Sequence, residues 1–187
     1  MPADGTVLIF NKDNYKVVVG DYDTYTAYSA DVDCRKEYRL NEEAYKPSSQ
    51  HFISVSTQGS VMSSCILAAV GGATGIHDHS ALICGDSCII AVGPFMCSLR
   101  IPSLDLEWKA EVDWATCFGV YYSAKHDCLI SHGELVIARV EHGGEIVWSS
   151  GGKDIFTGEF KLFDDYIEVT DFNDESYRFD ITTGKEK

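Results

Sequence analysis

Histidine and cysteine side chains gather in one short stretch of the chain, where their spacing could hold a metal ion. His77 and His79 are two residues apart, so both would project from the same face of a strand, and Cys84 and Cys88 follow closely. Zinc sites use such nitrogen and sulfur ligands in a tetrahedral arrangement. Cys84 and Cys88, however, flank a predicted turn and lack a matching second pair. We therefore expect loop histidines and core thiols here, with no metal or other cofactor.

A second combination of side chains could activate a thiol. His126 and Asp127 stand directly before Cys128, and a histidine beside a cysteine is the basis of thiol nucleophiles. Adjacent residues on a strand point to opposite faces, and Cys128 repeats the position of Cys88 in an apolar strand. The pattern therefore indicates a turn followed by a core cysteine, and we predict no catalytic residues.

Two further motifs resemble those of short-chain dehydrogenases. Val70–Ile76 looks like a glycine-rich nucleotide-binding turn, and Tyr121 and Lys125 have that family's Tyr-x-x-x-Lys spacing. In that fold a helix must follow the glycine turn, so that its amino terminus meets the pyrophosphate. His77 stands at the expected third glycine, and no helical period follows it. We therefore interpret Val70–Ile76 as a glycine-rich hairpin loop.

Charge is the strongest signal in the composition. The 187 residues include 29 Asp and Glu against 15 Lys and Arg, a formal net charge of −14. Such a surface repels phosphates, so we expect neither nucleic acid nor membranes as partners. The uncharged run Phe52–Ile76 contains too many Ser, Thr, Gln and Gly residues to span a bilayer. The amino terminus has no signal-peptide pattern, and the seven cysteines lie in apolar contexts, which predicts reduced thiols and a cytoplasmic location.

Acidic and tyrosine residues alternate in one segment, which predicts a binding face for a basic protein. Tyrosine supplies rigid contact area, and carboxylates attract a basic partner and accelerate the encounter. Trp114 lies among acidic residues and does not recur in the repeats described below. The predicted binding residues are Asp21, Tyr22, Asp23, Tyr25, Tyr28, Asp31, Asp33 and Trp114. A second segment, Asp164–Glu175, has six acids and no Lys or Arg. Solvated turns are the alternative interpretation of both segments.

The elements that must position these residues are predicted to be short antiparallel strands. No segment has a convincing helical period, and Asp33–Tyr45 is the best helix candidate. The expected strands are rich in β-branched and aromatic residues and end at Gly, Asp, Asn, Ser or Pro. They cover residues 7–10, 16–19, 52–55, 65–70, 81–84, 88–92, 96–101, 117–122, 128–130, 135–140, 145–148, 158–163, 166–169 and 177–181.

An internal repeat orders these strands. Cys88-Ile89-Ile90 recurs 40 residues later as Cys128-Leu129-Ile130, and Trp108 recurs 40 residues later as Trp148. A third copy begins at Tyr166. Repeats of short strands at this period are typical of propeller blades, which bury their faces against their neighbours. The two tryptophans are then expected to pack between sheets.

The part of the chain from about residue 80 to residue 187 resembles the blades of quinoprotein-type β-propellers. Gly143–Trp148, Asp165–Asp171 and Tyr177–Lys185 carry the resemblance, because they combine turn residues with short strands. It implies a propeller-like fold, and quinone binding is not carried over. We predict one all-β domain over 1–187, an antiparallel meander in about four sheets that forms a small propeller, a curved open sheet or a barrel. The expected units are 48–87, 88–127, 128–165 and 166–187, with 6–19 available to complete the last.

These observations predict a non-catalytic, acidic, protein-binding domain. Its size and charge are similar to those of bacterial immunity proteins, which block nuclease toxins, and this implies inhibition of a basic partner. The alternative is a metal-dependent enzyme or ligand binder centred on His77 and His79. A third hypothesis is a structural domain that self-associates, and the sequence leaves the oligomeric state open.

Overall fold

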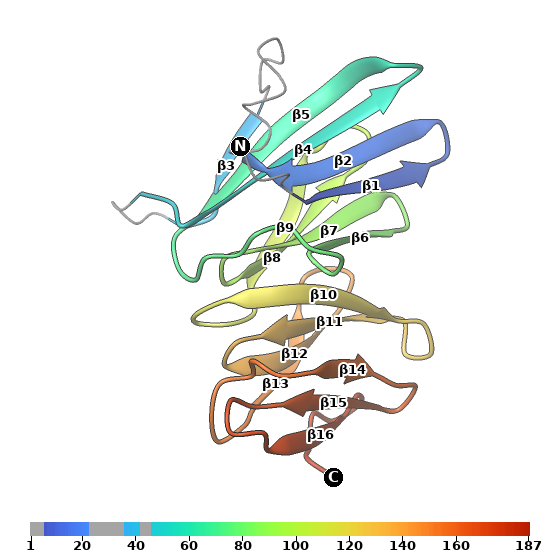
Figure 1. Ribbon diagram of the computed structural model, residues 1–187. Coiled ribbons are helices and arrows are strands. Elements are labelled where there is room, and N and C mark those ends of the chain that lie inside the picture. The colour runs from blue at the N-terminus through green and yellow to red at the C-terminus, as the bar shows by residue number, and fades with distance from the viewer. Residues whose placement is uncertain (1–5, 23–35, 42–45) are drawn as a thin grey trace.

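The computed structural model describes residues 6–22, 36–41 and 46–187, and the regular elements in these ranges are sixteen β-strands. The strands form four sheets that follow one another along a stack, from the amino-terminal sheet to the carboxyl-terminal sheet (Figure 1). The prediction of an all-β, propeller-like meander is confirmed. No helix within the described ranges is long and apolar enough to cross a membrane.

The first sheet has the strand order β1-β2-β4-β5-β3. Its antiparallel strands are β1 (Val7–Lys12), β2 (Tyr15–Asp21), β4 (Ser49–Thr57) and β5 (Ser60–Ala69), and β3 (Lys36–Arg39) runs parallel to β5 at the edge. Within the helix candidate Asp33–Tyr45, Lys36–Arg39 is therefore a strand and not a helix. Pairing with β5 gives β3 backbone hydrogen bonds along one edge, and this long-range contact overrides local helix propensity. Residues 33–35 and 42–45 lie outside the described ranges.

The other three sheets are antiparallel meanders in chain order. The second sheet consists of β6 (Ala81–Cys84), β7 (Ser87–Val92), β8 (Phe95–Arg100) and β9 (Leu106–Glu111). The third sheet consists of β10 (Cys117–Ser123), β11 (Cys128–Gly133), β12 (Val136–Val140) and β13 (Ile146–Gly151). The fourth sheet consists of β14 (Phe160–Leu162), β15 (Tyr166–Thr170) and β16 (Ser176–Asp180). Each of these three sheets combines strands from two neighbouring expected units. The sequence repeat gives the spacing between equivalent strands, but it does not show at which strand a sheet begins. β1 pairs with β2, and β2 pairs with β4, so residues 7–21 belong to the first sheet and not to the sheet of β14–β16.

Three apolar clusters hold successive sheets together. In β7, Cys88, Ile90 and Val92 face the first sheet, whereas Ile89 and Ala91 face the third. A third cluster joins the sheets of β10–β13 and β14–β16. Strand β7 is therefore buried on both faces, which explains why it has a continuous run of apolar residues rather than an alternating pattern.

The repeated tryptophans form equivalent joints between sheets. The indole nitrogen of Trp108 donates to the carbonyl of His142, and that of Trp148 donates to the carbonyl of Ile181, both at 2.8 Å. The rings lie against Gly144 and Gly184, which have φ values of 87° and 70°. A Cβ atom on either glycine would come within 2.7 Å or less of the indole ring. Each joint therefore needs both the tryptophan and the glycine.

Replacement of Gly144 tests this joint. Gly144→Ala is expected to lower the free energy of unfolding by about 2 kcal/mol or more, because the positive φ and the Trp108 ring both oppose a side chain. Gly143→Ala is the matched control, since a Cβ atom there meets nothing within 4 Å. It should change stability by about 0.5 kcal/mol at most. Urea unfolding measures both variants, and equal midpoints would contradict the role of Gly144.

Candidate functional site

The loops that lead from one sheet to the next gather at one end of the strands, on the left in Figure 1. Backbone hydrogen bonds tie these loops to one another and to the turns within the sheets. They run from Gly72 N to Ala115 O (2.8 Å), from Glu134 N to Thr116 O (2.7 Å), from Phe156 N to Glu134 O (2.7 Å) and from Phe172 N to Ile155 O (2.8 Å). We call this surface the loop face and define it by residues 71–72, 93–94, 112–116, 134–135, 152–159 and 171–175.

Trp114 projects from the loop face into solvent, with 79% of its surface exposed. The loop beneath it is fixed by the buried carboxylate of Asp113, which accepts hydrogen bonds from the backbone nitrogens of Ala115 (2.7 Å), Leu135 (2.8 Å) and Val136 (3.0 Å). A side chain on Gly133 would collide with this carboxylate. Trp114 is thus an exposed aromatic residue on a rigid loop, which is the form that an interaction anchor takes.

Phe172 is a second exposed aromatic residue on the loop face, at 68% exposure. Its turn is built on Asp171, which is buried and accepts hydrogen bonds from Asn173 N, Glu175 N and Tyr177 Oη, each at 2.9 Å. Burial alone would raise the pKa of Asp171, but these hydrogen bonds outweigh it and hold the pKa below its usual range. Phe172 is not among the predicted binding residues, although it has the same sequence signal as Trp114, an aromatic residue among acids in a turn.

The loop face is acidic. Its residues include seven acids, two of which, Asp113 and Asp171, are buried and hold the loops. The five that remain are Glu134, Asp154, Glu159, Asp174 and Glu175. One lysine, Lys153, accompanies them and forms a 2.5 Å ion pair with Glu175. Exposed aromatic residues here stand in a field that attracts cationic groups.

The first acidic segment lies mostly beyond what the structure describes. Asp23, Tyr25, Tyr28, Asp31 and Asp33 fall within residues 23–35, outside the described ranges, whereas Asp21 and Tyr22 are placed. Asp21 accepts hydrogen bonds from His51 Nδ1 (3.1 Å) and Ile76 N (3.2 Å). Burial would raise the pKa of Asp21, but the contacts with His51 and Ile76 lower it overall. This carboxylate therefore ties β2 to β4 and to the loop before β6, and the proposed contact with a partner stays a prediction for it and for Tyr22.

The second acidic segment does not form one surface. Asp165 lies in the β14–β15 turn at the opposite end of the strands, where Lys125 Nζ pairs with it at 2.6 Å. Glu168 pairs with Arg178 at 2.8 Å on the face of the last sheet. Only the residues of the β15–β16 turn, at 171–175, reach the loop face, because successive turns of a meander alternate between its two ends.

The structure does not bring the four candidate metal ligands together. His77 Nε2 lies 2.6 Å from the carbonyl oxygen of Phe118, and the His79 ring stacks on Tyr121. Cys88 packs between the first and second sheets, whereas Cys84 packs toward the third. Burial raises the pKa of Cys88 to about 12. Within the described ranges, no group of three or more His, Cys, Asp and Glu residues has the geometry of a metal site.

A row of stacked rings lines the inner strands instead. Tyr121 stacks on His79, with ring centroids 4.5 Å apart, and contacts the tilted ring of Phe160 at 4.3 Å. His132 stacks on Phe160 at 4.7 Å. His132 is 9% exposed, and its Nε2 has no hydrogen-bond partner. Burial, with the nearby His77 and His79, lowers the pKa of His132 to about 4. No sequence motif predicts this cluster, because its members come from four separate segments of the chain.

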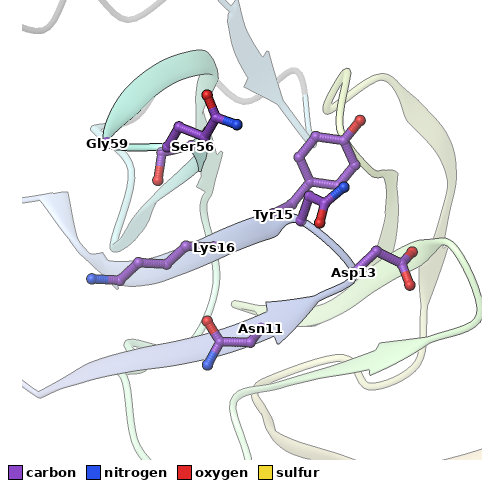
Figure 2. A pocket seen from close by; sticks show the side chains of 8 residues that line it. Asn11, Asp13, Tyr15, Lys16, Ser56 and Gly59 are labelled. Carbon is purple, nitrogen blue, oxygen red and sulfur yellow. The ribbon is translucent and has the colours of Figure 1, made fainter.

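A polar hollow of about 380 Å³ lies between the β1–β2 and β4–β5 turns. Figure 2 shows Asn11 and Lys16, which are partners across β1 and β2, and Asp13 in the turn that joins these two strands. The lining residues are Asn11, Asp13, Asn14, Tyr15, Lys16, Ser56, Gln58 and Gly59. Asp13 is the one carboxylate among them, and they include no histidine or cysteine. The hollow therefore offers hydrogen bonds but no set of groups for acid–base or metal chemistry.

Comparisons with known proteins establish the fold alone. No protein-family model matches the chain, and no curated protein matches it. The computationally designed Ika8 protein aligns with 97% of this chain and 60% of its own, with a TM-score of 0.54 and 10% identity. The WD40 β-propeller domain of Doa1 aligns with 96% of this chain and 52% of its own, with a TM-score of 0.53 and 10% identity. The chain thus spans only part of the length of these two proteins, and the likeness to the WD40 domain supports a propeller-like fold.

The buried imidazole of His132 predicts a pH dependence of stability. Because its pKa is about 4 when folded and near 6.5 when exposed, the unfolded chain binds a proton that the folded chain excludes between these values. The contribution of neutral His132 to the free energy of unfolding is complete above pH 6.5. As the pH drops toward 4, this free energy decreases by about 3 kcal/mol. His132→Phe keeps a ring between Phe118 and Phe160 and removes this proton.

Urea unfolding of wild type and His132→Phe between pH 7 and pH 4 measures the difference. Contributions from other titrating groups are common to both proteins and cancel in the comparison. Parallel losses of stability in the two proteins would show that His132 does not bind a proton on unfolding in this range.

Proposed function

We propose that this protein is a non-catalytic binding module whose loop face engages a basic protein. The observation that carries the proposal is the 79% exposure of Trp114 on a loop that the buried Asp113 holds rigid. A large aromatic side chain left in solvent costs free energy, and it regains that energy when a partner covers it. Because the loop is already fixed, binding would cost little ordering entropy.

The composition of the loop face supports a cationic partner. Phe172 provides a second aromatic contact, and the five acids that do not hold the loops outnumber the single lysine. The whole chain carries a net charge of −14, so it also attracts a basic partner from a distance. Opposite charges accelerate association and make it sensitive to salt, while the buried aromatic contacts set the rate of dissociation.

An immunity-type inhibitor of a basic enzyme, such as a nuclease toxin, is the more specific form of this proposal. Nuclease active sites are cationic because they bind phosphates, and an acidic surface with aromatic anchors can occupy such a site. The resemblance of the carboxyl-terminal repeats to quinoprotein blades contributes no ligand to the proposal. A metal-dependent function centred on His77 and His79 is less favoured, because Phe118 and Tyr121 already engage their rings.

Substitution of the exposed aromatic residues tests the proposed face. Trp114→Ala and Phe172→Ala should each reduce retention of basic proteins from a lysate of the source organism by about tenfold or more, because anchors of this type contribute about 2 kcal/mol or more. Stability should change little, since both side chains are mostly in solvent. The measurement is quantitative mass spectrometry of the proteins retained at low and at high salt.

Phe163→Ala is the matched control. Phe163 is also an exposed aromatic residue, at 39%, but it lies next to the β14–β15 turn at the other end of the strands. The Phe163→Ala variant should retain the same proteins as the wild-type protein. Identical retention by the Trp114, Phe172 and Phe163 variants would exclude the loop face as the binding surface, and retention that high salt does not reduce would exclude the role of charge.

A further inference from the structure

Three side chains from separate turns meet at the end of the strands opposite the loop face. Cys84 ends β6, Asp127 lies in the β10–β11 turn, and His142 lies in the β12–β13 turn. The Cys84 sulfur is 3.7 Å from His142 Nδ1, and His142 Nε2 is 2.9 Å from Asp127 Oδ1. An imidazole thus stands between a thiol and a carboxylate, which is the order of groups that activates a nucleophilic cysteine.

The carboxylate fixes which imidazole nitrogen can act as a base. Asp127 also accepts a hydrogen bond from Tyr122 Oη at 2.7 Å, and the hydrogen bonds from Tyr122 and His142 lower the pKa of Asp127. An ionised carboxylate can only accept, so the neutral ring carries its proton on Nε2. The lone pair on Nδ1 then faces the Cys84 thiol and can take its proton.

The imidazole is also held in place through its own backbone. Trp108 Nε1 donates to the His142 carbonyl at 2.8 Å, and the Trp108 ring packs on Gly144, two residues further on. The equivalent indole in the next pair of sheets, Trp148, bonds to the carbonyl of Ile181, an apolar residue. The joint between sheets therefore does not require an imidazole, and the presence of His142 beside Cys84 needs another explanation.

Cys84 is accessible, unlike other thiols in the sheets. Cys88, Cys97 and Cys117 are completely buried, whereas Cys84 is partly exposed at the edge of its cluster. The side chains of His142 and Asp127 are 45% and 74% exposed. A small molecule in solvent can therefore reach the sulfur and the base together.

We propose that Cys84 is a reactive thiol that forms mixed disulfides with small disulfides, preferably cationic ones, with His142 as its base and Asp127 as the residue that positions this base. The thiol proton passes from sulfur to His142 Nδ1 as the sulfur attacks one sulfur atom of the disulfide. A bond forms between Cys84 and that atom, the original disulfide bond breaks, and the leaving thiolate takes the proton from His142. One thiol and one disulfide yield one mixed disulfide and one small thiol.

The surroundings of the thiol explain why it needs a base. Burial and the negative charge of Asp127 raise the pKa of Cys84, so the sulfur remains protonated at neutral pH unless a neighbour removes the proton. The same exposed carboxylate favours a cationic disulfide over an anionic one. This site is at the opposite end of the strands from the loop face, so it stands or fails independently of the proposed binding function.

The test is the rate at which the native full-length protein forms a mixed disulfide at Cys84 with cystamine or with glutathione disulfide, followed by mass spectrometry of the intact protein and its peptides. At pH 7, Cys84 should react about tenfold or more faster in the folded protein than in the urea-unfolded chain. Cystamine, which is cationic, should react faster than the anionic glutathione disulfide. Cys84→Ser should abolish modification in that peptide.

Variants separate the base from simple exposure. His142→Gln should slow the reaction by about tenfold or more, and Asp127→Asn should slow it less. His126→Gln is the matched control, because His126 Nε2 contacts the carbonyl of Asp164 instead of the thiol, and its rate should equal that of wild type. Without His142 the rate should rise about tenfold per pH unit between pH 6 and 8, as thiol ionisation alone requires, whereas the wild-type rate should rise less steeply.

Specific results would overturn the proposal. If His142→Gln and Asp127→Asn, each shown by circular dichroism to be folded, react as fast as wild type with the same pH profile, His142 is not the base. If Cys84 reacts no faster in the folded protein than in the unfolded chain, the thiol is not activated. Faster reaction with glutathione disulfide than with cystamine would overturn the preference for cationic disulfides.

Discussion

The structure depends on the burial of both faces of its interior sheets. A sheet such as β6–β9 can hide two apolar faces only if another sheet lies on each side, and the clusters formed by Ile90 on one face and Ile89 on the other meet this requirement. The tryptophan–glycine joints set how closely the sheets approach at their outer strands, since Trp108 fits only over a glycine. These contacts hold successive sheets in a stack. In the described ranges, the regular elements of this stack are all strands.

The last sheet has one apolar face and one charged face. Its inner face contributes Ile167, Val169 and Phe179 to the third apolar cluster. Its other face carries Glu168, which is the register partner of both Lys161 and Arg178, and the Arg178 guanidinium pairs with this carboxylate at 2.8 Å. Alternation of apolar and charged residues thus appears where one face meets solvent, and it is absent from β7, where both faces are buried.

The two ends of the strands have different chemistry. At the loop end, buried carboxylates hold the loops: Asp113 beneath Trp114 and Asp171 beneath Phe172. The side chains left in solvent there are acidic or aromatic and suit association with a cationic surface. At the other end, short turns bring Cys84, Asp127 and His142 together. Because successive turns of each meander alternate between the ends, the proposed binding surface and the proposed thiol site lie at opposite ends of the strands.

The sequence by itself determined the fold class, the positions of all described strands except β3 and β9, and the acidity of the surface. Strand propensity, a period near 40 residues and charge are local or compositional properties. It also singled out Trp114, which the structure leaves 79% exposed, while the role of this residue in binding stays a prediction. Only the tertiary structure decided that Lys36–Arg39 is a strand, that Cys84 and Cys88 face different clusters, and that Asp21 holds His51. It alone joined Cys84 to His142, which is 58 residues away. The reason is physical: pairing and contact across sheets depend on how the strands stack, and spacing along the chain carries no record of which turns then become neighbours.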